Sequence, residues 1–343
     1  MKKLETMKAV YSYFFPEVRR LVHMSDKLPD KLFLISTPVE EAREMIASLF
    51  RTPLDLTATA DGKVDLDMVH EPVIDRIISA YGTAIPRLKD FSYRYPTSGS
   101  SEGIFKNLAM LKVGGVDWIY VLEGEYEGYK EYGKTLGIRT IEINPQKTDV
   151  RKLKPGIWFI SNPSAHDGNI LPDNFVGEIC DSGNKVYLDL AYVGSTRDYT
   201  FDVSHDNIPA VFLSFSKPYG VFRFRIGFTF SRAEIPSLYG NKWFKDIPRL
   251  FTALRLAEDI GPSKLYRSYR HVQESVIEHI NEDFGLCMKT SDAVLLGNLT
   301  LDSARKLDPY QLKMIAPFQR GEGYRFCLTP YFEKVEMKIL KGP

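Results

Sequence analysis

The feature that most constrains this chain is a regular alternation of short apolar runs and amphipathic helical segments through its middle. Runs rich in β-branched and aromatic residues predict strands, and apolar residues three and four positions apart predict helices. The predicted strands are 118–122, 140–143, 156–161, 186–190 and 210–214. The predicted helices are 73–81, 102–111 and 126–136. This alternation favours an α/β domain with a mostly parallel sheet between helices.

The pattern changes near residue 240, so we predict two domains, which a chain of 343 residues can accommodate. We expect 46–240 to form a large α/β domain. We expect 241–343 to form a smaller α+β domain that also includes the N-terminal segment 1–45. The predicted elements of the smaller domain are a long helical stretch over 247–283 and strands near 293–299 and 324–328.

The N-terminal segment carries two local patterns. Thr37 and Glu40 form a capping box, which predicts a helix over 38–50. An aromatic cluster at 11–15 either packs an N-terminal helix or closes over an apolar substrate.

Charge and cysteine content exclude several classes of function. The 45 basic and 44 acidic residues leave a formal charge of +1, so neither nucleic acid nor an anionic membrane is expected as a partner. Cys180, Cys287 and Cys327 form no CxxC pair, which argues against a disulfide framework or a metal site. No apolar run approaches the ~18 residues of a membrane span, and the N-terminus lacks the apolar core of a signal peptide. We expect a cytoplasmic protein.

Basic residues recur along the long helical stretch. They are Arg249, Arg255, Lys264, Arg267 and Arg270. Because acidic residues are interleaved with them, a solvated helix face is favoured over a polyanion site.

Three motifs in loops suggest a ligand. Residues 97–103 (TSGSSEG) precede a predicted helix, where small residues let the backbone approach an anion and the first N–H groups can bind it. Tyr126 follows a predicted strand and can stack on a planar ring. The turn 162–168 (NPSAHDG) follows another strand. Taken alone, each is as readily a helix cap, a packing contact or an ordinary turn.

Two further motifs are more specific. Asp189 ends an apolar strand, and Tyr192 follows three positions on. A buried acid needs a cation, such as a protonated ring nitrogen, unless it simply caps the next helix. Lys217 lies among serines, glycines and arginines in 214–227; burial and neighbouring cations can lower its pKa and let it form a Schiff base. Ser214 and Arg225 can then donate to a phosphate.

In this order, the S-x-S-K…R-x-R-x-G, D-x-A-Y, N-P and S-G-S-S-E stretches resemble fold-type I pyridoxal-phosphate (PLP) enzymes. The nearest likeness is to class I/II aminotransferases of the histidinol-phosphate and aspartate aminotransferase kind, over roughly 70–330. The resemblance implies a mostly parallel sheet between helices, a smaller α+β domain, and pyridoxal 5′-phosphate as cofactor. It also implies an amino acid and an oxo acid as substrates, and a homodimer.

The resemblance implies site residues one by one. Lys217 is the catalytic residue, which forms the Schiff base and carries the proton between the substrate Cα and cofactor C4′. Asp189 pairs with the pyridinium nitrogen, Tyr192 hydrogen-bonds the phenolic O3′, and Tyr126 stacks on the ring. The residues implied for the phosphate are Gly99, Ser100, Ser101, Ser214 and Arg225. Arg325 matches the family's arginine for the substrate α-carboxylate.

Several positions depart from the family's pattern. Where the family's turn reads N-P-x-N-P-x-G and its second Asn bonds O3′, this chain has Ala165 followed by His166. Either Asn162 takes over that bond or the bond is missing. Gly124 replaces the family's proline before the stacking aromatic, and His70 is the only obvious polar substitute for a tyrosine that the family often sends from the partner subunit. These changes favour a specialised branch.

Three functions follow from this reading. The first is an aminotransferase. The second is another fold-type I PLP enzyme, such as a lyase, a decarboxylase or an oxidase acting on an amino acid. The third is a binding protein without catalysis, against which the intact set of Lys217, Asp189 and Arg225 argues.

Overall fold

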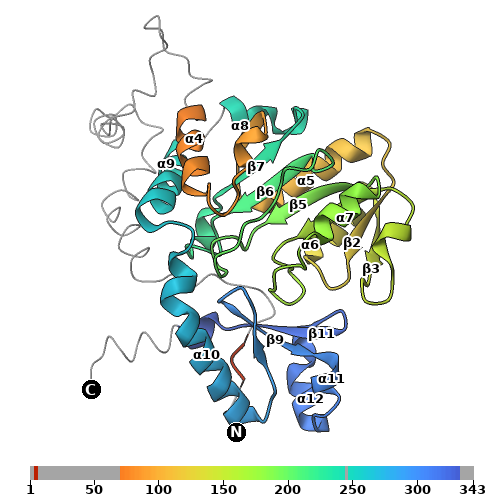
Figure 1. Cartoon of the computed structure of the whole chain (residues 1–343), viewed down its shortest axis with the longest axis vertical. Coiled ribbons are helices and arrows are strands. Elements are labelled where there is room, and N and C mark those ends of the chain that lie inside the picture. The colour runs from red at the N-terminus through yellow and green to blue at the C-terminus, as the bar shows by residue number, and fades with distance from the viewer. Residues whose placement is uncertain (1–3, 7–69, 244–245, 333–343) are drawn as a thin grey trace, which may run out of the picture.

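The computed structural model describes residues 4–6, 70–243 and 246–332 (Figure 1). The predicted helix over 38–50, the aromatic cluster at 11–15 and most of the N-terminal segment lie outside the described residues. Figure 1 shows a larger α/β part and, below it, a smaller part built around a second sheet. The predicted domain boundary near residue 240 stays a prediction.

The larger part contains a seven-stranded sheet with the order β1-β7-β6-β5-β4-β2-β3. Its strands are β1 (Tyr93–Thr97), β2 (Trp118–Leu122), β3 (Arg139–Ile143), β4 (Ile157–Ser161), β5 (Lys185–Leu190), β6 (Ala210–Ser214) and β7 (Gly227–Ser231). Strands β2 to β6 pair in parallel, whereas β7 is antiparallel to both β6 and β1. The mostly parallel sheet of an α/β fold is therefore confirmed.

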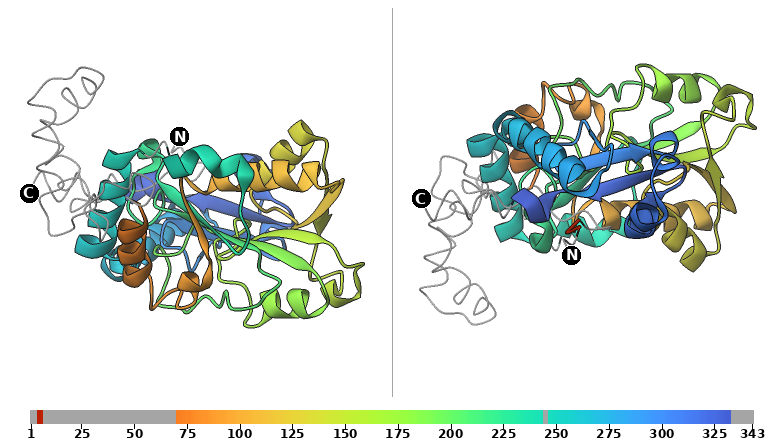
Figure 2. Two further views of the ribbon diagram at one scale, coloured as in Figure 1. Left: turned by 90° about the horizontal axis from the view of Figure 1, so that it is seen from above. Right: turned by 90° about the horizontal axis from the view of Figure 1, so that it is seen from below.

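Helices cover both faces of this sheet (Figure 2). One face packs against α5 (Ser100–Val113) and α6 (Glu127–Leu136), through a core that includes Ile104, Leu108, Ile119, Val121, Tyr129, Phe159 and Phe212. The other face belongs to a larger core that also holds apolar residues of α4 (Glu71–Ala80), α7 (Phe175–Asp181) and α9 (Ile247–Arg255). Alternating side chains are buried on both sides, as expected for parallel strands.

The smaller part is an antiparallel four-stranded sheet with the order β10-β11-β9-β8. Its strands are β8 (Lys289–Thr290), β9 (Leu296–Thr300), β10 (Gln319–Arg320) and β11 (Gly323–Cys327). Helices α10 (Lys264–Phe284), α11 (Leu301–Ala304) and α12 (Pro309–Ile315) accompany it. In the N-terminal segment, Thr6 donates its hydroxyl to the carbonyl of Cys327, at 2.9 Å.

The prediction of one long helical stretch over 247–283 is wrong in one respect. Helix α9 runs into a single π-helical turn, Leu256–Ile260, and the chain then breaks at Gly261 before α10 begins. Gly261 has φ of +77°, and Pro262 follows it. A left-handed glycine ends a helix, and proline cannot continue one.

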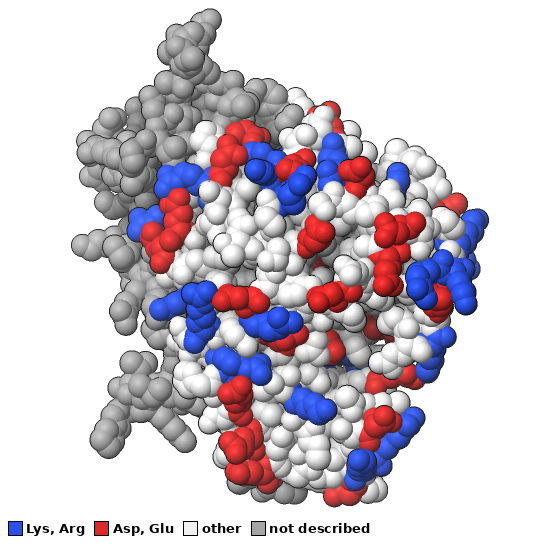
Figure 3. Space-filling model, viewed as in Figure 1, with Lys and Arg blue, Asp and Glu red and all other residues white. Residues whose placement is uncertain are grey.

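The arginines of this stretch are paired with acids, as the solvated-face interpretation predicts. Arg249, Arg255, Arg267 and Arg270 form ion pairs with Asp246, Asp259, Asp198 and Glu274. Figure 3 shows basic and acidic side chains interspersed over this side of the molecule. Among the residues that the structure describes, no helix combines the length and apolarity that a membrane crossing needs.

Candidate active site

Three neighbouring parallel strands end at one edge of the large sheet. Their register pairs Ser161 of β4 with Asp189 of β5, and Leu190 of β5 with Leu213 of β6. The loops that carry the 162–168 turn, Tyr192 and Lys217 therefore leave the sheet side by side. Ligands of α/β sheets bind at this carboxyl edge.

Asp189 lies at this edge with only 4% of its surface exposed. Burial raises its pKa to about 6, whereas Lys217, the Ala191 N–H and the hydroxyls of Ser100 and Tyr129 lower it. The Ala191 nitrogen lies 3.1 Å from Oδ1, and the Tyr129 hydroxyl lies 3.4 Å from Oδ2. A carboxylate in this environment favours a cationic partner.

Lys217 follows β6 and faces several charged groups. Burial lowers its pKa, Asp189 raises it, and Arg225 and Arg325 lower it further. Its Nζ lies 5.5 Å from the centre of the Tyr192 ring. The structure thus brings together a lysine, an acid and two arginines that are far apart in sequence. A lowered pKa makes the neutral, nucleophilic amine more accessible.

Gly99, Gly227 and Arg225 lie close together where α5 begins, and we call this group the glycine cradle. Gly99 has φ of +80°, and a Cβ there would lie 2.9 Å from Nη2 of Arg225. A Cβ on Gly227 would lie 2.6 Å from Cα of Gly99. Nη2 of Arg225 donates to the carbonyl of Ser98 at 2.9 Å and to the hydroxyl of Ser101 at 2.6 Å. Only glycine allows these groups to come so close.

Several donors surround this cradle. Only 1% of the Ser216 surface is exposed, and its hydroxyl has no hydrogen-bond partner among the described residues. The Ser214 hydroxyl accepts the Ser216 N–H at 3.3 Å. Ser100 opens α5, a helix of 14 residues whose first turn has no side-chain cap. Free N–H groups, a helix dipole, hydroxyls and a guanidinium together suit a phosphate.

Tyr126 lies directly before α6 and packs beside Ala165 and Tyr192. Burial raises its pKa above the usual range, and the charges of Asp189 and Arg225 also act on it, in opposite directions. The Tyr126 ring therefore lies close enough to feel the charges of both Asp189 and Arg225.

The 162–168 turn contributes backbone and amide groups. Asn162 donates its N–H to the carbonyl of Asp189 at 2.9 Å, and its Oδ1 accepts from the N–H of Leu171 at 3.0 Å. Its side-chain oxygen is thus occupied within the protein, and Asn162 is buried at this edge of the sheet. Ala165, which occupies the position of the family's second Asn, packs its side chain against Tyr192.

Two arginines of the smaller sheet approach this edge. Arg325 of β11 is buried, and its Nη1 donates to the carbonyl of Ala165. Arg320 of β10 is also buried, and it pairs with Glu127 at 2.9 Å. Burial lowers the pKa of Arg320, and the charge of Arg325 lowers it further.

Sequence reasoning missed Glu125, Tyr129 and Ser216. Glu125 is buried after β2 and accepts from the Ser164 hydroxyl at 2.6 Å and from the Ala165 N–H at 3.3 Å. Burial raises its pKa to about 7 despite these hydrogen bonds. An acid next to the end of an apolar strand is the signal that singled out Asp189, and it could have found Glu125.

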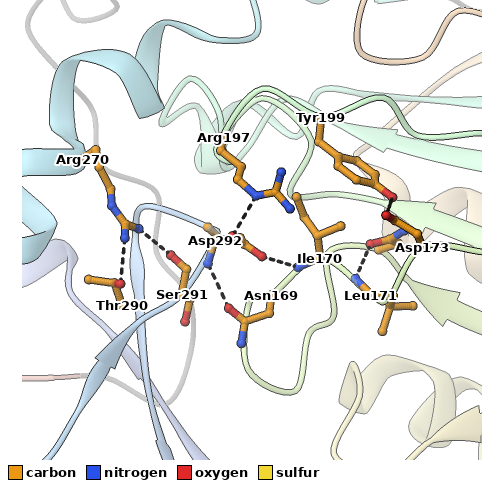
Figure 4. Close-up of polar contacts among 12 residues, drawn as sticks. Asn169, Ile170, Leu171, Asp173, Arg197, Tyr199, Arg270, Thr290, Ser291 and Asp292 are labelled. Atoms are coloured by element: carbon orange, nitrogen blue, oxygen red, sulfur yellow. Dashed lines mark hydrogen bonds and ion pairs between the residues drawn. The ribbon is translucent and has the colours of Figure 1, made fainter. Parts of the chain in front are cut away.

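A second set of contacts fastens the smaller sheet to the loop that follows this turn (Figure 4). Asp292 accepts from the N–H of Ile170 at 2.9 Å and pairs with Arg197 at 3.2 Å. Its own N–H donates to Oδ1 of Asn169 at 3.0 Å. These contacts hold the two sheets together beside the site.

The family described as aminotransferase class I and II matches residues 95–286, more than half of the chain. A comparison with curated sequences found no match. The fold is similar to those of many solved structures, including an aminotransferase, a decarboxylase and a C-S lyase.

Histidinol-phosphate aminotransferase from Sinorhizobium meliloti, in complex with pyridoxal-5′-phosphate, is 16% identical with a TM-score of 0.61 over 93% of this chain and 84% of that chain. L-threonine-O-3-phosphate decarboxylase from Porphyromonas gingivalis is 12% identical, with a TM-score of 0.57 over 88% and 96%. A PLP-bound C-S lyase from Staphylococcus hominis is 12% identical, with a TM-score of 0.57 over 75% and 74%.

Pyridoxal phosphate, which the histidinol-phosphate aminotransferase and the C-S lyase hold, fits the residues present here. The glycine cradle beside Arg225 has no room for side-chain atoms, the Ser216 hydroxyl lacks a partner within the described residues, and Asp189 and Lys217 share one buried site. The cofactor is pyridoxal 5′-phosphate. The chain belongs to the class I and II aminotransferase family, a divergent member of the fold-type I PLP-dependent enzymes.

Proposed function

We propose that this protein is an aminotransferase that moves an amino group between an amino acid and a 2-oxo acid. The observation that carries the proposal is the environment of Lys217. Burial and two arginines lower its pKa, while Asp189 faces it across the carboxyl edge of the sheet. A lysine in this environment can bond covalently to an aldehyde and can later carry a proton.

The cofactor-facing roles follow from the donors present. When bound, pyridoxal phosphate supplies an aldehyde that combines with amines and a ring that withdraws electrons from the substrate Cα. In our proposal Asp189 holds the proton on the ring nitrogen, and Tyr192 and Asn162 donate toward O3′. Tyr126 packs against the ring. The proposed phosphate ligands are Gly99, Ser100, Ser101, Ser214, Ser216 and Arg225.

The substrate-facing roles fall to two residues. Lys217 moves the proton to and from the substrate Cα through its Nζ. Arg325 binds the α-carboxylate, for which a planar guanidinium can supply two parallel hydrogen bonds. Because Arg325 comes from the smaller sheet, it would orient the substrate against Lys217 on the larger one.

The test begins with the purified protein loaded with pyridoxal phosphate, which should be yellow. A panel of L-amino acids should include a donor that bleaches the colour, and a 2-oxo acid should restore it. Colour without reversible bleaching would favour the alternative, another fold-type I reaction such as a lyase, decarboxylase or oxidase. Protein that takes up no cofactor would contradict both.

Two further properties belong to this proposal. We propose a homodimer, as is usual in the family, which sedimentation of the loaded protein would measure. We also propose a cytoplasmic location, which fractionation of the native cells would measure.

A further inference from the structure

Glu125 has an environment that no role assigned so far explains. Its carboxyl group is buried between β2 and α6, with 5% of the residue exposed. A buried carboxyl group is costly unless hydrogen bonds replace the water it loses. The hydroxyl of Ser164 and the N–H of Ala165 supply such bonds at 2.6 and 3.3 Å, and the side chain of Ser161 supplies another. Ser161 ends β4, and Ser164 and Ala165 lie in the turn that follows it.

The contacts of Ala165 continue toward the substrate arginine. Its N–H donates to Glu125, and its carbonyl accepts from Nη1 of Arg325. The N–H and the carbonyl belong to one residue and are separated only by its φ and ψ torsions, so a change at the N–H that alters either torsion also moves the carbonyl. Glu125 therefore acts on Arg325 through one intervening residue.

The surroundings of the turn leave little room for another arrangement. A Cβ on Gly124 would lie 2.6 Å from Cδ2 of His166 and 3.0 Å from the carbonyl carbon of Arg320. The loop after β2, the turn after β4 and the β10–β11 connection thus touch one another directly. A shift at Glu125 would be passed on rather than absorbed, because packed interiors have few voids.

We propose that Glu125 is a positioning residue for Arg325, which it holds in its substrate-binding orientation through the Ser164–Ala165 segment. The inference rests on the proposed function, in which Arg325 binds the substrate α-carboxylate. It assigns a use to an acid that does not touch the reacting atoms. Three charged or titratable groups act on this site together with Glu125, namely Asp189, Tyr129 and Arg320.

Two variants separate geometry from charge. Glu125→Ala removes both acceptors. Glu125→Gln removes the charge but can still accept the Ala165 N–H and donate to the Ser164 hydroxyl. Glu131→Ala, an exposed acid on α6, is the matched control.

The experiment compares crystal structures of the three loaded variants with that of the wild type, and steady-state kinetics with the amino donor found in the panel. For Glu125→Ala we expect the Ala165 carbonyl to turn from Arg325, and KM for the donor to rise roughly 10- to 100-fold. We expect kcat and the affinity for pyridoxal phosphate to change less than about 3-fold. For Glu125→Gln we expect KM to stay within about 3-fold of the wild-type value.

The outcomes separate this inference from the proposed function. An unmoved Arg325 in Glu125→Ala, or a KM within 3-fold of the wild type, would overturn the positioning role. A parallel loss of kcat and cofactor affinity with unchanged KM would overturn it as well. If no L-amino acid in the panel acts as an amino donor, the proposed function fails. The crystal structures of the variants alone then still decide whether Glu125 holds Arg325.

Discussion

The glycine cradle, which we propose binds the phosphate, and the 162–168 turn lie at the same edge of the sheet but are built differently. The cradle consists of glycine backbone, a helix start and hydroxyl groups around Arg225. The turn keeps the family's Asn162-Pro163 but has Ala165 in place of the second Asn, and its contacts run to Glu125 and Arg325. The cradle follows the family's pattern, and the turn departs from it.

The difference bears on what each region binds in our proposal. A phosphate needs backbone N–H groups, hydroxyls and a cation close to it, and small residues beside an arginine meet that need. In our proposal the turn also serves the cofactor through Asn162, but where the family has its second Asn, the Ala165 backbone joins a buried acid, Glu125, to the proposed substrate arginine, Arg325. We therefore expect substitutions in the cradle to weaken cofactor binding and substitutions around the turn to change substrate recognition.

The largest effect should come from Lys217→Ala, which removes the lysine on which the charges of Arg225, in the cradle, and Arg325, beside the turn, both act. Loss of the covalent bond and of the proton carrier should lower kcat by at least about 10³-fold. The measurement is single-turnover bleaching of the loaded protein by the amino donor. Lys185→Ala, at the opposite end of β5, should react like the wild type. Bleaching of Lys217→Ala at the wild-type rate would contradict the assignment.

Glu125→Gln should flatten the pH dependence of stability in the cofactor-free protein. Burial raises the pKa of Glu125 from 4.5 to about 7, so the folded state holds this proton more tightly than the unfolded state. The stabilisation that protonated Glu125 gives the wild type is therefore fully present below pH 4.5, and it is lost as the pH rises through 7. Over this pH range the free energy of unfolding of the wild type should fall, relative to that of the variant, by on the order of 3 kcal/mol.

Urea unfolding of both proteins at several pH values between about 4 and 8 measures this difference. Asp189, whose pKa burial also raises, stays in both proteins and so contributes equally to first order. Parallel curves for the two proteins would show that Glu125 is not held in a buried, proton-retaining environment.

Gly99→Ala should weaken cofactor binding through the cradle alone. The added Cβ meets Nη2 of Arg225 at 2.9 Å, and the φ of +80° strains any other residue. We expect Kd for pyridoxal phosphate to rise about 10-fold or more. Gly115→Ala is the control, because Gly115 has φ of +84° but nothing within 4 Å of its Cβ. It should lower stability by about 1 kcal/mol and leave Kd unchanged. Equal Kd values for both variants would contradict the cradle.

The smallest effect should come from Tyr129→Phe, which tests the support of Asp189. The Tyr129 hydroxyl lies 2.9 Å from the Ser161 hydroxyl and 3.4 Å from Asp189. Loss of one hydrogen bond is worth about 1 kcal/mol, so Kd for pyridoxal phosphate should rise roughly 5-fold. Tyr310→Phe, exposed on α12, serves as control. A Kd equal to that of the wild type would remove Tyr129 from the site.

The sequence predicted the sheet where local patterns are strong. The apolar runs ending at Leu122, Leu190 and Ser214 coincide with strands. It missed β1, whose five residues include Arg94 and Pro96, and it missed β7, whose start was assigned to the lysine loop. Both are antiparallel neighbours at one side of the sheet, and their pairing comes from tertiary contacts that no short window contains.

The site was predictable as a set of motifs and not as a set of contacts. Each motif identifies a residue and the predicted strand that it follows or ends. Because parallel neighbouring strands end at the same edge of a sheet, these predictions are enough to bring Asp189 near Lys217. The hydrogen bond from Arg325 to Ala165 joins the two sheets, and its existence depends on how they pack. Glu125 carries the local signal of an acid next to the end of an apolar strand, but its partners lie in β4 and in the turn that follows it, far away in the sequence.

The central claim is that Lys217 bonds covalently to the cofactor opposite Asp189. The direct measurement is reduction of the loaded protein with borohydride, followed by proteolysis and mass spectrometry. Our account predicts the added mass of a reduced pyridoxyl phosphate on the peptide that contains Lys217, and its absence from Lys217→Ala. The same mass on a different lysine of the wild type, or on none, would contradict it.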